Sequence, residues 1–98
     1  MGRHVLLIED EPNIVEAIRF ILTRDGWRVS THGDGADAVA VVQRLRPDVV
    51  ILDVMLPGQL GLEVLRALRA DPALAALRVM VLTAKGATRR KAWGRMCL

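Results

Sequence analysis

Cysteine, aromatic side chains and long apolar runs are all scarce in this sequence. The single cysteine, Cys97, excludes an internal disulfide framework and a metal site built from several thiolates. The basic residues are dispersed and lack the interleaved aromatic side chains of many nucleic-acid surfaces. No apolar run approaches the roughly 20 residues that cross a bilayer, and no signal peptide is recognisable. We therefore expect a cytoplasmic protein with no membrane partner and no direct contact with nucleic acid.

What the sequence does contain is enough apolar residues for one core. Its 98 residues allow a single domain, spanning residues 1–98, and 52% of them are hydrophobic. A chain of this size buries roughly 60–65% of its unfolded surface. The net charge is +3, and the one basic cluster, Arg89-Arg90-Lys91, fits a solvated helix face better than a phosphate-binding patch.

Strand-like and helix-like patterns alternate along the chain. Continuous or alternating apolar runs predict strands over 5–8, 27–31, 48–52 and 78–82. Apolar residues at helical spacing predict helices over 12–24, 36–45 and 62–69, and a further helix beginning near Ala87 and including Trp93. This alternation, with short connections, predicts an α/β fold with a doubly wound parallel sheet and right-handed crossovers, with four strands in this chain.

Acidic residues follow two of the predicted strands. Glu9-Asp10-Glu11 comes directly after the first strand and Asp53 after the third. Because the carboxyl ends of parallel strands meet at one edge of a sheet, we expect these carboxylates to lie close together. Crowded carboxylates repel one another unless a cation neutralises them, and ligands that are all oxygen favour Mg²⁺ or Mn²⁺ over zinc. For Glu11 the better interpretation is an acidic residue at a helix start.

A hydroxyl and an amine follow the fourth predicted strand, at Thr83 and Lys85. Beside a carboxylate cluster, these groups predict a site that handles phosphoryl groups, because Mg²⁺ commonly shares a phosphate oxygen. A dinucleotide-binding enzyme would instead need glycines after the first strand. A phosphatase with an aspartate nucleophile often has a second aspartate two residues on, where this chain has Met55.

Three ordered motifs, LLIEDEP, VVILDVMLPGQLGLEVL and VMVLTAKG, give the chain a resemblance to a known family. From about His4 to Trp93 the sequence resembles the receiver domain of bacterial two-component response regulators. The resemblance implies a flavodoxin-like fold in which Asp53 accepts a phosphoryl group from a histidine kinase, a phosphotransfer protein or a small phosphodonor. Such a domain is not an enzyme beyond assisting its own phosphorylation and dephosphorylation.

The resemblance also assigns roles around Asp53. Glu9 and Asp10 match the acidic pair that, with Asp53 and the backbone carbonyl of Met55, holds Mg²⁺. Thr83 matches the switch hydroxyl that closes on the phosphoryl group.

The sequence departs from the family pattern in ways that suggest an alternative. The family has five strands and five helices and a lysine before a proline near the end of the fifth strand, whereas this sequence stops before that strand. Lys85 is not that lysine, because it lies two residues after Thr83. Leu60 stands where the family commonly has aspartate, with a small expected effect. The alternative is a receiver-like interaction or dimerisation module impaired in phosphorylation.

Two further expectations concern the fourth strand and the histidines. Without a final strand and helix the domain would be incomplete at its C-terminal end, and the edge of the strand over 78–82 would be exposed. Exposed edges pair with other chains, which predicts a homodimer or a domain-swapped assembly. His4 and His32 lack partners at ligand spacing, so we expect both in loops or at the surface.

Overall fold

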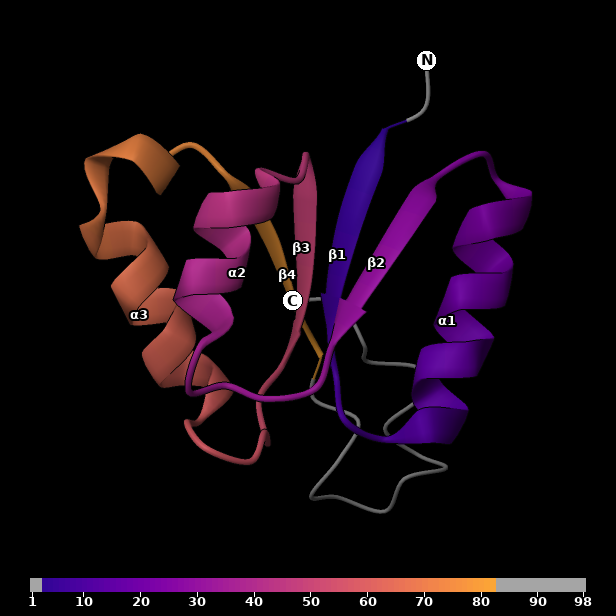
Figure 1. Cartoon of the computed structure of the whole chain (residues 1–98), viewed down its shortest axis with the longest axis horizontal. Helices are drawn as coiled ribbons and strands as arrows, with labels where there is room; N and C mark the ends of the chain where they lie inside the picture. The colour runs from indigo at the N-terminus through magenta and orange to yellow at the C-terminus, as the bar shows by residue number, and fades with distance from the viewer. Residues whose placement is uncertain (1–2, 83–98) are drawn as a thin grey trace.

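A four-stranded parallel sheet with helices on both faces forms the fold (Figure 1). The computed structural model describes residues 3–82. The sheet order is β2-β1-β3-β4, and every pairing is parallel. The elements in chain order are β1 (His4–Ile8), α1 (Pro12–Arg24), β2 (Arg28–His32), α2 (Ala38–Leu45), β3 (Val49–Asp53), α3 (Gly61–Ala70), the 3-10 helix η1 (Pro72–Leu74) and β4 (Arg78–Leu82).

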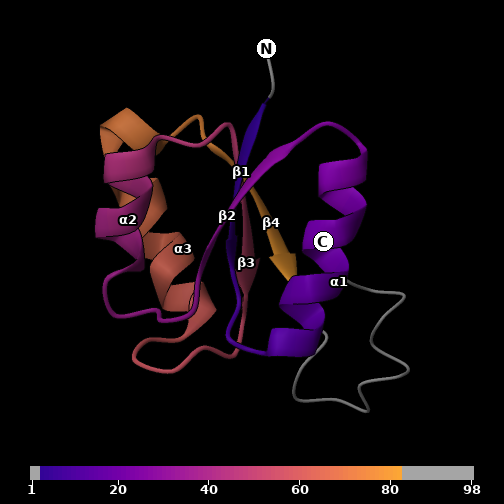
Figure 2. The ribbon, with the colours of Figure 1, turned by 45° about the vertical axis from the view of Figure 1, so that its right-hand side comes forward.

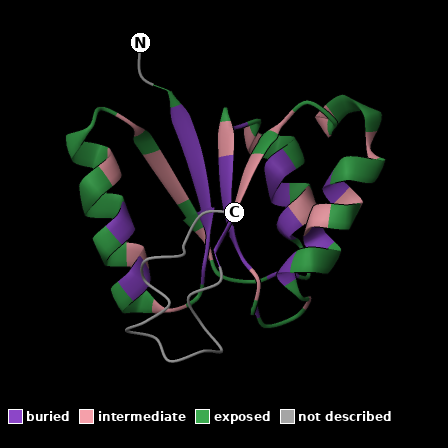
Figure 3. Ribbon diagram, turned by 180° about the vertical axis from the view of Figure 1, so that it is seen from behind, coloured by how far each residue is buried: buried purple, intermediate pink, exposed green. Residues whose placement is uncertain are grey.

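Figures 1 and 2 both show α1 on one face of the sheet and α2 and α3 on the other. Residues of β1 alternate between two clusters: Leu6 packs with α2 and α3, whereas Leu7 packs with α1. This alternation is the ordinary consequence of successive strand side chains pointing to opposite faces. Burial is greatest in β1 and in the inner part of β3, while β2 is only partly covered (Figure 3). The predicted doubly wound sheet, with the third predicted strand in the interior, is thus confirmed.

The observed boundaries lie within two residues of the predicted ones. The predicted second strand begins one residue later, at Arg28, and the second helix begins at Ala38 rather than Ala36. Ala36 is instead in a turn, where its N–H donates to Asp34 Oδ1 over 2.7 Å. η1 was not predicted, and Asp71 caps it by accepting from the Ala73 N–H at 2.9 Å. The predicted helix over Ala87 to Trp93 lies outside the described residues.

The placement of His4 corrects an expectation. His4 is the first residue of β1 and is buried rather than in a loop or at the surface, with Nε2 2.7 Å from Ser30 Oγ. Its backbone N–H donates to Asp48 Oδ2 at 2.7 Å, and its carbonyl accepts from the Asp48 N–H at 2.8 Å. His32 is the partly exposed last residue of β2. Within residues 3–82, none of the helices has the length and apolarity that a membrane span requires.

Candidate metal site at the carboxyl ends of β1 and β3

The two acidic segments meet because β1 and β3 are neighbours in register. Ile8 pairs with Leu52, so Glu9, one residue beyond β1, comes level with Asp53, the last residue of β3. One carboxylate oxygen from each of Glu9, Asp10 and Asp53 lies within 4.8 Å of the others. The structure therefore brings together three of the four carboxylates that the sequence places at this edge, and the group does not include Glu11.

The three carboxylates differ in their access to water. Glu9 and Asp53 are almost fully buried, at 2% and 1% exposure, whereas Asp10 is exposed. Burying carboxylate charge is costly unless it is compensated by hydrogen bonds or by positive charge. The group offers only hard oxygen donors and is open on one side, which fits the partly hydrated coordination that Mg²⁺ prefers.

Backbone hydrogen bonds orient the buried carboxylates. The Glu11 N–H donates to Glu9 Oε2 at 2.9 Å, and the Met55 N–H donates to Asp53 Oδ1 at 3.2 Å. The Glu9 N–H in turn donates to the carbonyl of His32 at 2.9 Å, which ties the site to the end of β2. Glu9 and Asp53 are thus set in place by the chain on which they lie.

Gly61 is a site residue that the sequence reasoning missed. Its N–H donates to the carbonyl of Val54 at 2.7 Å, and a Cβ built on it would overlap the carbonyl oxygen of Asp53 and lie 2.8 Å from Val54 Cα. The first residue of α3 therefore packs against the backbone at the end of β3. The available signal was a glycine at a helix start, where a side chain is usually tolerated.

The other residues singled out in the sequence differ in where they lie. The Met55 side chain is 48% exposed, and the role of its carbonyl as a ligand stays a prediction. Thr83 and Lys85 lie outside the described residues. Glu11 precedes α1 as its N-cap, as expected of an acidic residue at a helix start, although its side chain makes no capping hydrogen bond. Leu60 is the N-cap of α3 and likewise supplies no side-chain cap.

A histidine and an aspartate form a short hydrogen bond near this edge. His32 Nε2 lies 2.6 Å from Asp37 Oδ1. The hydrogen bond from His32 is the main cause that lowers the pKa of Asp37, so the carboxylate stays ionised. Because Asp37 is exposed, the pair contributes little to stability.

Sequence comparisons place these residues in a wider group of proteins. The sequence model of the response regulator receiver domain matches residues 5–93. The "Probable transcriptional regulatory protein TcrX" of Mycobacterium tuberculosis is 48% identical over 83 residues, which are 85% of this chain and 35% of that protein. The "DNA-binding response regulator MtrA" of Mycolicibacterium smegmatis is 40% identical over 85 residues, which are 87% of this chain and 36% of that protein. The chain thus spans about a third of the length of these curated relatives.

Solved structures share the fold. The receiver domain of the sensor histidine kinase PA1611 from Pseudomonas aeruginosa PAO1, with a magnesium ion coordinated in its active site cleft, has a TM-score of 0.81 and 31% identity, covering 93% of this chain and 75% of that one. The BeF3-activated receiver domain of Klebsiella pneumoniae RstA has a TM-score of 0.74 and 28% identity, covering 90% of this chain and 73% of that one. The similarity thus extends to one receiver domain with a coordinated magnesium ion and to one that is BeF3-activated.

Proposed function

We propose that this chain, which belongs to the response regulator receiver domain family, accepts a phosphoryl group on Asp53 in two-component signalling. Family membership follows from the match over residues 5–93 and confirms the resemblance seen in the three sequence motifs. The observation that carries the proposal is the grouping of Asp53 with Glu9 and Asp10 at the carboxyl ends of β1 and β3. Asp53 and Glu9 are the buried members of this group, and the exposed Asp10 keeps its solvent side open to a cation.

The transfer step needs little covalent chemistry from the protein. A carboxylate oxygen of Asp53 attacks the phosphorus of a phosphohistidine, and the new O–P bond forms as the P–N bond breaks. The imidazole nitrogen keeps the electron pair and takes a proton from solvent. Positioning and electrostatic stabilisation account for most catalysis of phosphoryl transfer, and the Met55 N–H to Asp53 Oδ1 hydrogen bond holds the nucleophile in one orientation.

Glu9, Asp10 and Asp53 would hold Mg²⁺ together with the backbone carbonyl of Met55, and Mn²⁺ would substitute. When bound, the ion supplies positive charge against the transferring phosphoryl group. The exposed Asp10 gives the group an open side toward solvent, and the donor set is free of soft ligands. We further propose Thr83 as the hydroxyl that donates to the phosphoryl oxygen after transfer, which would bias the segment that follows β4.

The proposed donor is a histidine kinase or a phosphotransfer protein. The chain would act in the cytoplasm, without direct contact with nucleic acid or membrane, and would act on no substrate beyond its own aspartyl phosphate. Two relatives have names that describe transcriptional regulation and DNA binding. For this chain, which spans about a third of their length, the proposal is limited to receiving the signal.

Intact-mass spectrometry after incubation with Mg²⁺ and acetyl phosphate tests the proposal. We expect the mass of one phosphoryl group to be added to the wild type and lost in Asp53→Asn, with Asp10→Asn requiring more Mg²⁺. Asp25→Asn makes the same change at an exposed residue that follows α1, and it should label normally. Labelling that survives Asp53→Asn would refute the assignment.

The second candidate function is an interaction or dimerisation module that no longer takes phosphate. The observation that favours it is the position of β4, which pairs with β3 alone among the strands of residues 3–82. Failure of the wild type to take up phosphate at saturating Mg²⁺, with the fold intact, would favour this function over the first.

A further inference from the structure

We propose that Gly35 is a positioning residue for the metal site, because the loop over 33–37 clamps the loop over 54–60 that carries Met55. The inference rests on the proposed function, since it concerns the same metal site. The first loop joins β2 to α2 and the second joins β3 to α3. The two loops are separated in sequence by residues 38–53 and meet beside the carboxyl ends of the strands.

Gly35 makes a close backbone contact between the two loops. It is buried, and its N–H donates to the carbonyl of Pro57 at 2.9 Å. A Cβ built on Gly35 would overlap the carbonyl oxygen of Gln59 and lie 3.0 Å from its carbonyl carbon and 3.1 Å from its nitrogen. All three atoms belong to the backbone, so no flexible side chain can move aside. A side chain at Gly35 must therefore displace backbone where the two loops meet, and we infer that the Pro57–Gln59 segment shifts.

Gly58 completes the contact from the opposite side. Its φ of +84° is one that residues with a side chain rarely adopt, and a Cβ there would overlap Asp34 Oδ1 and lie 3.0 Å from the Ala36 nitrogen. Asp34 Oδ1 is itself fixed, because it accepts from the Ala36 N–H at 2.7 Å. Gly35 of the first loop thus lies against the backbone of the second loop, and Gly58 of the second loop lies against the backbone and the Asp34 side chain of the first.

The rest of the loop over 54–60 is held by contacts near both of its ends, so a shift of Pro57–Gln59 cannot be absorbed there without moving neighbouring residues. Leu56 is buried in the cluster between α2 and α3, and the Val54 carbonyl accepts from the Gly61 N–H. The Met55 N–H bonds to Asp53 Oδ1. Only one residue separates Met55 from Pro57, whose carbonyl Gly35 holds. Movement at Pro57–Gln59 is therefore transmitted to the Met55 peptide and to the orientation of Asp53.

Mg²⁺ is sensitive to displacements of this size. It requires nearly ideal octahedral geometry with short ligand distances, so small shifts of one carbonyl weaken binding. Residues that orient metal ligands typically affect affinity by roughly 10–100-fold when changed. The close contacts of Gly35 are with Pro57 and Gln59 rather than with the carboxylates, so its effect would be exerted through the loop over 54–60.

Gly33→Ala provides a matched control for Gly35→Ala. A Cβ at Gly33 would lie 3.8 Å from Asp10 Cα and 3.8 Å from the Glu9 carbonyl oxygen, which are ordinary contacts. Gly33 is thus nearer the carboxylates than Gly35, yet the substitution fits. If proximity to the acidic residues mattered most, Gly33→Ala would be the more harmful change.

The test is calorimetric Mg²⁺ titration of the wild-type chain and both variants, with urea unfolding of each. We expect Gly35→Ala to weaken Mg²⁺ binding about tenfold and Gly33→Ala to leave it within about twofold. With Gly35→Ala, phosphate uptake from acetyl phosphate should need more Mg²⁺ but approach the wild-type rate at saturation. A purely structural role would lower the urea midpoint and leave the Mg²⁺ affinity of the folded protein unchanged, which would overturn the inference.

A second variant covers the case in which Gly35→Ala does not fold. Gly58→Asn places a side chain against Asp34 with a residue that tolerates positive φ, and Gly58 is exposed. It should also weaken Mg²⁺ binding, and wild-type affinity in a folded Gly58→Asn would overturn the inference. If the wild type does not bind Mg²⁺, the proposed metal site itself is refuted. If the wild type binds Mg²⁺ and both the Gly35 and Gly58 variants bind it equally well, only the positioning role of Gly35 is refuted.

Discussion

At the scale of single residues, the division between buried and exposed carboxylates explains how one small site can combine precision with access. Glu9 and Asp53 are nearly inaccessible to solvent and receive backbone hydrogen bonds, so their positions follow those of the strands. Asp10 is exposed, so an ion bound beside it could keep water ligands on its solvent side. In the proposed metal site, the buried members would set the geometry and the exposed member would provide the entry side.

His4 is the residue whose burial has a direct consequence for pH dependence. Burial, followed by the nearby Arg28, lowers the pKa of His4 below its ordinary value of 6.5, while Asp48 opposes the shift. The folded state therefore releases this proton more readily than the unfolded chain. The resulting stability is fully present above about pH 6.5 and is lost as the pH falls from there toward the lowered folded-state pKa.

Urea unfolding of the wild type and of His4→Gln across this pH range checks the prediction. Glutamine can keep a hydrogen bond to Ser30 Oγ but does not titrate. We expect the stability advantage of the wild type over His4→Gln to shrink as the pH falls below 6.5, because other titrating groups affect both proteins alike. A difference in unfolding free energy that does not change with pH would contradict the proposed burial effect.

At the scale of elements, the end of α2 holds an unfavourable residue. Arg46 is its C-cap and has φ 48° and ψ 58°, the only positive φ of a non-glycine residue among those described. This left-handed conformation suits glycine. We expect Arg46→Gly to raise the free energy of unfolding by roughly 0.5–1 kcal/mol, because relief of the strain outweighs the added freedom of the unfolded chain.

Arg44→Gly is the matched control, because Arg44 is exposed in the last turn of the same helix. There glycine should lower the free energy of unfolding by about 1 kcal/mol. The two variants lose the same side chain and charge in one helical segment, and urea unfolding should give effects of opposite sign. Equal destabilisation by both variants would rule out relief of backbone strain at Arg46.

Local patterns were sufficient for most elements and for the core of the site. The apolar runs that became β1 and β3 are covered on both faces, and this explains why Asp10 and Asp53 could be brought together from the sequence. The start of α2 was predicted too early because helical spacing does not reveal that Asp34 holds Ala36 in a turn. His4 was misplaced because its partners, Ser30 and Asp48, are distant in sequence.

The contacts of Gly35 and Gly61 could not be predicted for a related reason. Each is a close approach to backbone that another loop or strand end supplies, and a glycine in the sequence does not identify its neighbour. Sequence patterns report faces and periods, whereas such contacts depend on how completed elements meet. The sequence therefore pointed to Glu9, Asp10 and Asp53, which the structure brings together. It did not point to Gly35 and Gly61, whose close contacts depend on the absence of a side chain.

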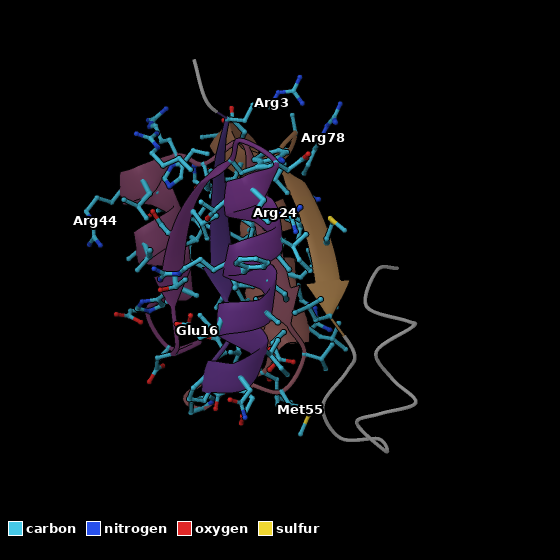
Figure 4. All side chains as sticks on the ribbon, turned by 90° about the vertical axis from the view of Figure 1, so that its right-hand side faces the viewer. Arg3, Glu16, Arg24, Arg44, Met55 and Arg78 are labelled. Carbon is cyan, nitrogen blue, oxygen red and sulfur yellow. The ribbon has the colours of Figure 1, made fainter. Side chains whose placement is uncertain are left out.

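At the scale of the whole molecule, the two ends of the sheet differ in charge. Figure 4 shows Arg3 and Arg78 at one end of the molecule and Met55 at the other. The carboxylate group lies where β1 and β3 end, whereas Arg3 precedes β1 and Arg78 begins β4. The negative charge of the carboxylates would repel an anionic phosphodonor unless a bound cation neutralises it, which agrees with the proposed requirement for Mg²⁺.

Within residues 3–82, β2 and β4 lie at the two edges of the sheet, and the difference between them makes the proposed self-association testable. β2 contains Arg28, Ser30 and Thr31, whereas β4 continues from Arg78 through four apolar residues to Leu82. Apolar edges pair with other chains more readily than polar ones, and a lysine on an edge strand opposes pairing. Self-association through β4 should therefore be weakened by Met80→Lys. As the control, Thr31→Lys introduces the same residue on the β2 edge.

Light scattering over increasing protein concentration checks this prediction. We expect the wild type and Thr31→Lys to shift from monomer to dimer mass, and Met80→Lys to remain monomeric at the same concentrations. Met80 is partly buried against the cluster that includes α1, so circular dichroism must first show that Met80→Lys is folded. A monomeric wild type at high concentration would exclude the dimer, and equal dimerisation by both lysine variants would place the contact away from either edge.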